Sequence, residues 1–204
     1  ILGAPASGKG TISSRIVKKY QMHHVSSGDK LRDHINKQTE LGKEVKSYLS
    51  EGKLVPDDVM IKFMIAELRK VQNRPWLLDG FPRTVAQANA LWQLQPVDVV
   101  LNLVVPFEVI IDRVKNRWVH LPSGRVYNIG FNTPKVKGKD DVTGEDLIQR
   151  PDDTPEAVLK RLEIYEKVTR PVITFYKEKG ILKEFEGRTS DEIWPKVTTF
   201  LDST

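Results

Sequence analysis

The chain has 204 residues, of which 39% are hydrophobic and 29% charged, a balance typical of a soluble globular protein with one substantial core. No apolar run is long enough to span a bilayer, and the absence of cysteine excludes disulfide frameworks, thiolate catalysis and cysteine-bound zinc. Lysine and arginine number 32 against 27 acidic residues, and the net charge of +5 favours anionic partners without identifying them.

Buried strands and amphipathic helices alternate along the chain. Residues 1–3 are typical of the end of a strand, and the helical segment that follows carries Ile12, Ile16 and Tyr20 on one face. Short apolar runs that predict further strands occur at 22–25, 76–78, 97–105 and 181–185. Because segments with helical spacing separate these runs, the pattern predicts a parallel α/β sheet flanked by helices.

Two helices are expected between the second and third strands. The first has its apolar positions within 41–49 and ends at Gly52, a residue type that commonly follows a helix C-terminus. The second has its apolar positions within 59–68 and is entered through Pro56, since proline is favoured just before or at the start of a helix.

Two more helices are expected in the last quarter of the chain. A long one covers 158–176, where Pro171 breaks or kinks it and Gly180 ends it before the last strand. The final helix begins at Thr189, and the spacing from Thr189 to Glu192 fits a capping box.

The segment 117–154 has a different pattern, with turn-forming residues and short extended pieces in place of helical spacing. It indicates small hairpins inserted into the core. A second, helical insertion lies near residues 26–55, and two lobes on one core suggest closure over ligands. The predicted division is therefore a core made of 1–25, 56–116 and 155–204, a helical lobe at 26–55 and a lid at 117–154.

A phosphate-binding loop is indicated between the first strand and the first helix. Gly8, Lys9 and Thr11 supply a small residue, a lysine and a hydroxyl at the mouth of the helix, where backbone N–H groups attract phosphate oxygens. The strict motif has serine or threonine directly after the lysine, whereas here Gly10 intervenes. An ordinary turn with capping glycines remains the alternative, but it gives no reason for the lysine.

An acidic residue and a set of arginines follow this loop. Asp79 stands at the carboxyl end of the strand at 76–78, where ligands bind in open α/β sheets, and suits Mg²⁺ or its water shell. Phosphoryl transfer uses fixed positive charge, because negative charge spreads over the oxygens of the transferred group. The candidates for this role are Arg32, Arg83, Arg113, Arg117, Arg150 and Arg161. For any single one of them, the alternative is that it is only an exposed surface charge.

Four segments resemble the adenylate kinase family in order and spacing: 3–11, 26–32, 79–83 and 120–127. The resemblance covers the whole chain. It implies a P-loop nucleoside monophosphate kinase fold, with a monophosphate-binding lobe at 26–55 and a small β lid. It also implies reversible, Mg²⁺-dependent phosphoryl transfer from a nucleoside triphosphate to AMP, without a covalent enzyme intermediate.

The same resemblance assigns site residues position by position. The catalytic set it implies is Lys9, Arg83, Arg117, Arg150 and Arg161, with Asp79 at the Mg²⁺ through water. The triphosphate site it implies is Ala6, Gly8, Lys9, Gly10, Thr11, Arg113, Arg117, Tyr127 and Ser190, with the 187–190 turn near the base. The AMP site it implies is Ser27, Arg32, Lys53, Val55, Gly80, Arg83, Gln87, Arg150 and Arg161, with the Gln87 amide reading the base.

Some lids in the family hold zinc through four cysteines, and this lid has none. At the corresponding positions, other members similar to this chain have a hydrogen-bonded cluster in place of the zinc site. The residues at these positions here are His120, Ser123, Asp140 and Thr143. We therefore expect a structural polar cluster and no zinc.

Within the family, segments 105–108, 117–120 and 193–195 look like the members of the mitochondrial matrix that take GTP, or ITP, as donor. The resemblance thus implies GTP and AMP as substrates, a matrix location and a monomer, with ATP as the alternative donor. Two departures bear on this. Ala6 replaces a usual glycine of the loop, and Arg188 stands where GTP-using members often have threonine.

Two functions of other classes are alternatives. A nucleotide-sensing module without catalysis would follow if Ala6 distorted the phosphate loop. A nucleic-acid binder is suggested by the basic charge alone, but the basic residues follow phosphate-loop positions and not clustered stacking platforms. We therefore expect no nucleic-acid partner and no membrane partner.

Overall fold

The computed structural model describes residues 1–71, 73–130, 132–149 and 154–204. A layer of parallel strands lies at its centre. β4 (Val100–Val104) pairs with β1 (Leu2–Gly3) on one side and with β7 (Leu182–Glu186) on the other, while β2 (His23–Ser26) pairs with β3 (Trp76–Asp79). The register sets Val25 beside Leu78 and Leu103 beside Phe185.

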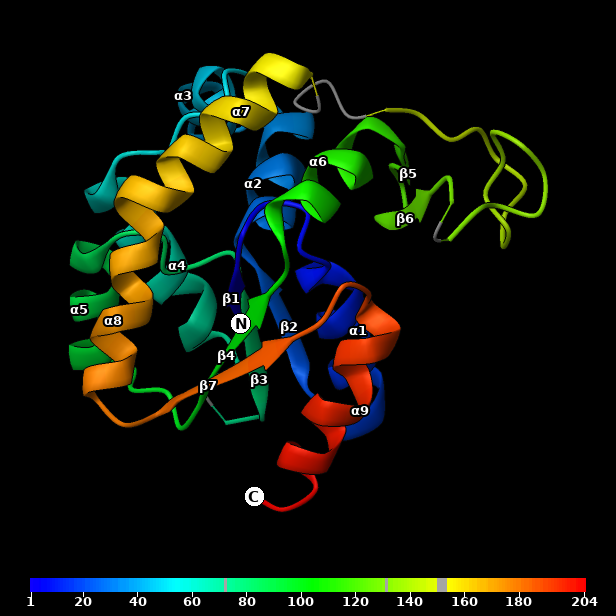
Figure 1. Ribbon diagram of the computed structural model, residues 1–204. Helices are drawn as coiled ribbons and strands as arrows, with labels where there is room; N and C mark the ends of the chain where they lie inside the picture. Colours follow the sequence, from blue (N-terminus) through cyan, green and yellow to red (C-terminus); the bar gives the residue numbers. More distant parts are fainter. Residues whose placement is uncertain (72, 131, 150–153) are drawn as a thin grey trace.

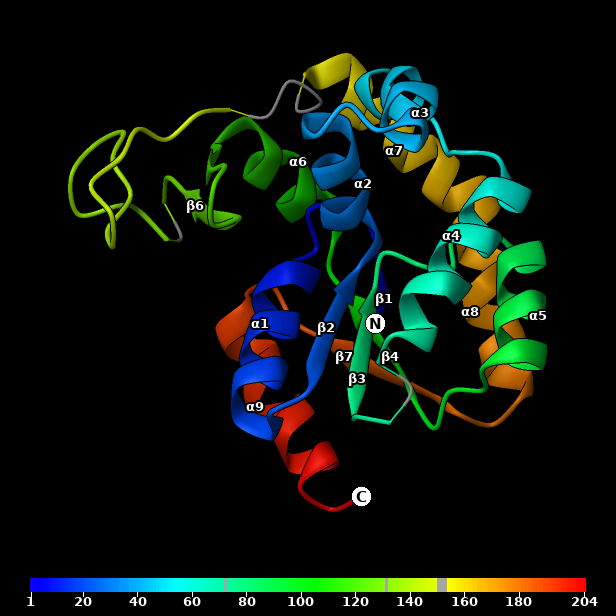
Figure 2. The same ribbon diagram turned by 180° about the vertical axis from the view of Figure 1, so that it is seen from behind.

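Helices cover both faces of these strands. Figures 1 and 2 show α1 (Lys9–Tyr20) and α9 (Ser190–Leu201) on one side, and α4 (Asp57–Arg69), α5 (Val85–Leu94) and α8 (Arg170–Glu178) on the other. Ile12 and Ile16 of α1 are almost fully buried, and each contributes about 1.5–3 kcal/mol by leaving water. This arrangement confirms the α/β class with a parallel sheet flanked by helices.

The remaining helices lie at the carboxyl ends of the strands. They are α2 (Ser27–Asn36), α3 (Glu40–Ser50), α6 (Phe107–Lys115) and α7 (Pro155–Ile164). Thr39 caps α3 by accepting a hydrogen bond from the N–H of Gly42, and Ser26 caps α2 in the same way through Asp29. The helices expected within 41–49 and 59–68 are confirmed as α3 and α4.

The long helix expected at 158–176 is present but changes its winding. Five residues of π-helix (Tyr165–Thr169) join α7 to α8, and the N–H of Arg170 donates to the carbonyl of Tyr165. Pro171 lies in the first turn of α8. Proline has no N–H and its ring crowds the carbonyl four residues earlier, so a locally wider turn accommodates it without ending the helix.

The capping box expected at α9 forms with one change. The Thr189 hydroxyl accepts from the N–H of Glu192 at 3.1 Å, as predicted. The Glu192 carboxylate, however, accepts from the N–H of Arg188 at 2.8 Å and not from that of the cap residue itself. The carboxylate therefore holds the turn before α9 one residue further back than the motif requires.

The segment predicted as the lid contains an antiparallel hairpin of β5 (Arg117–His120) and β6 (Arg125–Asn128). Val119 also bridges to Ile148, which brings the later part of the segment back to β5. Figure 1 shows these green and yellow-green residues projecting away from the central strands. Within the described residues, no helix is both long and apolar enough to cross a membrane.

Candidate active site

The loop after β1 leads directly into a helix with free N–H groups. Gly8, at φ 91°, is the last residue before α1, and Lys9 is the first residue of the helix. Gly10 and Thr11 lie in the first turn and are exposed. N–H groups at such a position have no partner within the helix and attract phosphate oxygens, so the loop has the geometry of a phosphate cradle.

Ala6 adopts the left-handed backbone conformation, with φ 60°. An L-residue other than glycine costs about 1–2 kcal/mol there, because its Cβ crowds the following carbonyl. Its own carbonyl accepts a hydrogen bond of 3.2 Å from Nη1 of Arg113, which lies on α6. The loop therefore does require a positive φ at Ala6, and a contact from outside the loop helps to hold it.

The Lys9 ammonium group donates to the carbonyls of Gly3 and Ala4, each at 2.8 Å. Burial lowers the pKa of Lys9 to about 8, and the positive charges of the nearby arginines act in the same direction against the opposing effect of Asp79. The carbonyls keep the ammonium group within the loop. A bound triphosphate must compete with these carbonyls for the N–H donors of Lys9.

Asp79 ends β3 and is buried, with 8% of its surface exposed. Ser13 of α1 donates to its Oδ2 at 3.1 Å, and His24 Nε2 lies 3.6 Å from the same oxygen. Burial raises the pKa of Asp79, but His24 and Lys9 outweigh this effect and bring the pKa down to about 2. The carboxylate is therefore charged at neutral pH.

The residues around Asp79 fit a magnesium ion that arrives with its nucleotide. A hard divalent cation prefers oxygen ligands, and it usually keeps several waters and phosphate oxygens besides one or two carboxylates. Asp79 supplies one charged carboxylate beside the phosphate loop. Among the described residues, no group of three or more histidine, cysteine or acidic side chains is placed to hold a metal by itself.

Positive side chains from separate elements meet at one cavity. Its lining combines residues of the phosphate loop, the 52–54 segment, the 80–83 segment and the helix after the lid: among them are Lys9, Gly52, Leu54, Gly80, Arg83 and Arg161. Nε of Arg83 donates to the carbonyl of Gly80 at 2.7 Å, which fixes the guanidinium group near the end of β3. Three of the five predicted catalytic residues therefore line the same space.

The other two predicted catalytic residues are not among the lining residues named above. Arg117 begins β5, and its charge contributes to the lowered pKa of Lys9. Arg150 lies outside the described residues, and its assignment stays a prediction.

Residues predicted to bind AMP come from α2 and from the end of β3. Ser27 is buried beside Gly80, where an added Cβ would lie 2.6 Å from the Ser27 hydroxyl. Arg32 forms an ion pair with Asp29 one turn earlier in α2. An incoming phosphate would have to compete with that carboxylate for Arg32.

The remaining predicted AMP contacts are engaged within the protein. Gln87 is 2% exposed; its Oε1 accepts from the N–H of Arg83 at 2.8 Å, and its Nε2 donates to Asp57 at 2.9 Å. The Lys53 side chain pairs with Glu51, and Val55 is buried. One N–H of the Gln87 amide is left for a base, so its role as base reader stays a prediction.

Arg113 joins the phosphate loop to the turn before α9. Besides its bond to Ala6, it donates through Nη2 to the carbonyl of Arg188 at 2.5 Å. A Cβ added to Gly8 would lie 2.7 Å from the Ser190 hydroxyl, so loop and turn are in contact. The Arg188 side chain pairs with Glu108 on α6 at 3.2 Å. The backbone of the turn therefore lies beside the predicted donor site.

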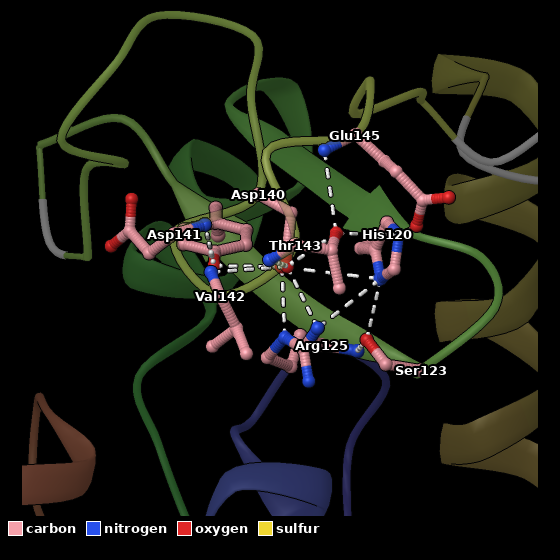
Figure 3. A network of polar contacts seen from close by, with 9 residues as sticks. His120, Ser123, Arg125, Asp140, Asp141, Val142, Thr143 and Glu145 are labelled. Carbon is pink, nitrogen blue, oxygen red and sulfur yellow. Dashed lines mark hydrogen bonds and ion pairs between the residues drawn. The ribbon is translucent and has the colours of Figure 1, made fainter.

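A polar cluster fills the lid, as Figure 3 shows. His120 contacts the Ser123 hydroxyl at 2.6 Å and the Thr143 hydroxyl at 3.3 Å, and Thr143 donates to Asp140 at 3.0 Å. The structure thus confirms the hydrogen-bonded cluster expected from His120, Ser123, Asp140 and Thr143.

Sequence reasoning missed three members of this cluster. Arg125 binds both carboxylate oxygens of Asp140, at 2.8 and 2.7 Å, and Glu145 lies 2.6 Å from His120 Nε2. The hydrogen bonds from Arg125 hold the pKa of Asp140 well below its usual range. Alternation in β6 could have placed Arg125 and Tyr127 on one face, but nothing in the sequence fixes the register of 140–145 against it.

Tyr127, predicted as a nucleotide contact, is one of these missed members. Its ring is 4% exposed, and its hydroxyl donates to Asp140 at 2.9 Å and accepts from the N–H of Asp141 at 2.8 Å. In this structure the hydroxyl belongs to the lid cluster and not to an open binding surface. A role toward the nucleotide would have to come from the edge of the ring.

The parallel sheet flanked by helices, the loop between β1 and α1 and the hairpin after α6 are those of a nucleoside monophosphate kinase. The pattern that describes the adenylate kinase family matches residues 1–181, and the chain belongs to that family. It is 57% identical over 202 residues to the mitochondrial GTP:AMP phosphotransferase of Drosophila melanogaster, covering 99% of this chain and 94% of that protein. It is also 48% identical over 213 residues to the protein of the same name from Saccharomyces cerevisiae, covering 100% of this chain and 91% of that one.

Proposed function

We propose that this chain transfers the terminal phosphoryl group of GTP to AMP, giving GDP and ADP reversibly. The observation that carries the proposal is the meeting of Lys9, Arg83 and Arg161 at one cavity beside the phosphate loop. The two relatives described above are named GTP:AMP phosphotransferase, and this chain matches nearly the full length of both, which supports the choice of substrates.

The chemistry is a direct displacement. An oxygen of the AMP phosphate forms a bond to the terminal phosphorus of GTP, and the bond between that phosphorus and the bridging oxygen of GDP breaks. Lys9 and the N–H groups at the start of α1 hold the outer phosphates. Arg83, Arg117, Arg150 and Arg161 supply the positive charge that stabilises the transferred group in the transition state.

Asp79 would hold the magnesium ion through its water shell, and the ion would neutralise the charge that develops on the phosphate oxygens. Asp79 is suited to this because it is charged and stands at the carboxyl end of β3 beside α1. Ser13 orients its carboxylate through the 3.1 Å hydrogen bond.

We further propose that the 187–190 turn reads the donor base through its backbone. Arg113 ties this turn to the phosphate loop, so the base and the triphosphate would be bound by one connected unit. Arg188 does not interfere, because its side chain pairs with Glu108 on α6. We also propose a mitochondrial location, which the names of the relatives support.

The test is transfer to AMP in Mg²⁺ buffer, with GTP, ITP and ATP compared as donors by coupled detection of ADP. We expect GTP and ITP to have the highest kcat/KM. If ATP leads, the chain is an ATP-using adenylate kinase and the interpretation of the 187–190 turn is wrong. Nucleotide binding without any ADP formation would identify a sensing module instead.

A further inference from the structure

Gly52, at the end of the lobe that contains α3, lies directly against α7. Figures 1 and 2 both show α3 beside α7, although more than a hundred residues separate them in the sequence. A Cβ built on Gly52 would lie 3.1 Å from the carbonyl oxygen of Ala157 and 3.2 Å from Cγ of Arg161. These distances are shorter than ordinary van der Waals contacts of a Cβ atom. The close approach of residue 52 to α7 therefore depends on the absence of a side chain at this position.

The backbone of Gly52 adds a second constraint. Its φ is 67°, in the left-handed region, and its N–H donates to the carbonyl of Leu49 at 3.2 Å. This turn ends α3 and directs Lys53 to Val55, the segment predicted to contact AMP, across the cavity. Gly52 therefore determines both the direction of that segment and its distance from α7.

Arg161 connects this contact to the chemistry. It lines the same cavity as Gly52, Lys9 and Arg83, and its charge contributes to the lowered pKa of Lys9. Because a side chain at Gly52 would meet the aliphatic stem of Arg161, it would displace the stem and with it the guanidinium group at its end. A misplacement of about 1 Å at a reacting centre can reduce the rate about 10²-fold.

We propose that Gly52 is a positioning residue for Arg161: its bare Cα lets the AMP-binding lobe settle on α7 and holds the arginine stem in the orientation used for phosphoryl transfer. This rests on the proposed function of the chain. It couples the segment that contacts AMP to the charge on the transferred phosphoryl group, so that the arginine is in place when AMP is bound.

The chain contains a matched control for the test. Gly180 has φ 75°, close to that of Gly52, but nothing lies within 4 Å of a Cβ built on it. Alanine at either position brings the same backbone strain, about 1 kcal/mol. Only at Gly52 does alanine also contact α7, at the Ala157 carbonyl and the Arg161 stem, so the difference between the two variants measures these contacts together.

The experiment compares Gly52→Ala with Gly180→Ala in kcat, in KM for AMP and GTP, and in melting temperature. We expect Gly52→Ala to lose more stability than Gly180→Ala, because only the Gly52 variant adds a tight contact with α7 to the backbone strain. Gly180→Ala should keep the kcat of the unchanged protein, whereas Gly52→Ala should lose at least tenfold in kcat. If Gly52→Ala does not fold, Gly52→Asn and Gly180→Asn replace the pair, since asparagine tolerates the left-handed region.

A double variant separates positioning of Arg161 from a purely structural role. In an Arg161→Ala background Cγ is absent, so adding Gly52→Ala should lower kcat by less than threefold more, which is the non-additivity expected of contacting residues. Equal kcat for Gly52→Ala and Gly180→Ala would overturn the inference, as would a full Gly52→Ala effect in the double variant. Absence of transfer to AMP by the unchanged protein would instead refute the proposed function.

Discussion

The Lys9 ammonium group is buried and hydrogen-bonded to two carbonyls of its own loop, while arginines surround it. Two consequences follow for this residue. Its side chain is placed before any ligand arrives, which reduces the entropy lost on binding. Its proton is also held less tightly than that of an exposed lysine, because burial and like charge both disfavour the charged form.

Replacing this lysine should abolish most turnover without unfolding the chain. Lys9→Met keeps the length and removes the charge that meets the outer phosphates, so we expect kcat to fall by about 10³-fold or more. The control is Lys18→Met, because Lys18 is an exposed residue of the same helix. Melting temperatures within a few degrees for both variants, with turnover lost only in Lys9→Met, would bear this out; near-normal turnover in Lys9→Met would remove Lys9 from the mechanism.

The pH dependence of kcat/KM for GTP should report the same residue. In the free enzyme the pKa of Lys9 is lowered to about 8, so the charged form prevails below that pH and is lost above it. We therefore expect kcat/KM for GTP to fall as the pH rises through about 8, since kcat/KM follows the ionisation of the free enzyme. A profile that stays flat up to pH 10 would contradict the lowered pKa.

At the scale of elements, we expect the cap of α9 to affect both stability and donor binding. Thr189→Ala removes the hydrogen bond to the N–H of Glu192 and should lower the free energy of unfolding by about 1 kcal/mol. Because the cap adjoins the 187–190 turn, KM for GTP should rise while KM for AMP stays unchanged. Thr199→Ala is the control, since Thr199 is an exposed residue in the same helix; equal effects of the two variants in denaturant unfolding would argue against a capping role.

The lid is an element held by polar contacts around one carboxylate. Asp140→Asn would replace a charged acceptor by an amide facing Arg125, Tyr127 and the N–H of Thr143. Arg125 is partly exposed but Asp140 is buried, and donors left without their acceptor around a buried group cost about 1–3 kcal/mol, so amide hydrogen exchange in 117–149 should accelerate at least tenfold while the core is unchanged. Asp146→Asn, which affects an exposed pair with Lys139, should leave exchange as it was; similar exchange in both variants would show that Asp140 does not hold the lid together.

Local patterns predicted the elements better than the partners of their side chains. The strand, loop and helix at 1–20, the position of Asp79 at the end of β3, and the helices α3 and α4 each depend on a few neighbouring residues, and the structure confirms them, while phosphate binding by the loop stays a prediction. The π-helical turn before Pro171 was not predicted, because a proline signals interruption but not the way in which a helix accommodates it. The engagement of Gln87 with Asp57 and of Tyr127 with Asp140 depends on how distant segments are placed in space, which no local pattern encodes.

At the scale of the whole molecule, the charges proposed for catalysis come from separate parts of the fold. Lys9 belongs to the phosphate loop, Arg83 follows β3, and Arg161 stands on α7, which Gly52 of the AMP-binding lobe contacts. A site distributed in this way is complete only when the lobe and the lid are both in place. We therefore propose that AMP helps to assemble the site as well as supplying the acceptor.

This arrangement predicts little transfer to water. We propose that AMP strengthens the contact of the lobe with α7, so that without AMP the arginines are held less firmly around the terminal phosphate of GTP. With AMP, the acceptor occupies the position that an attacking water would need, and closure excludes solvent. We therefore expect phosphate release from GTP alone to be at least about 10³-fold slower than ADP formation with AMP present, measured by phosphate detection and by coupled assay on the same preparation. Hydrolysis within tenfold of the transfer rate would mean that the site is complete without AMP, and the distributed assembly would then have no role in protecting the phosphoryl group.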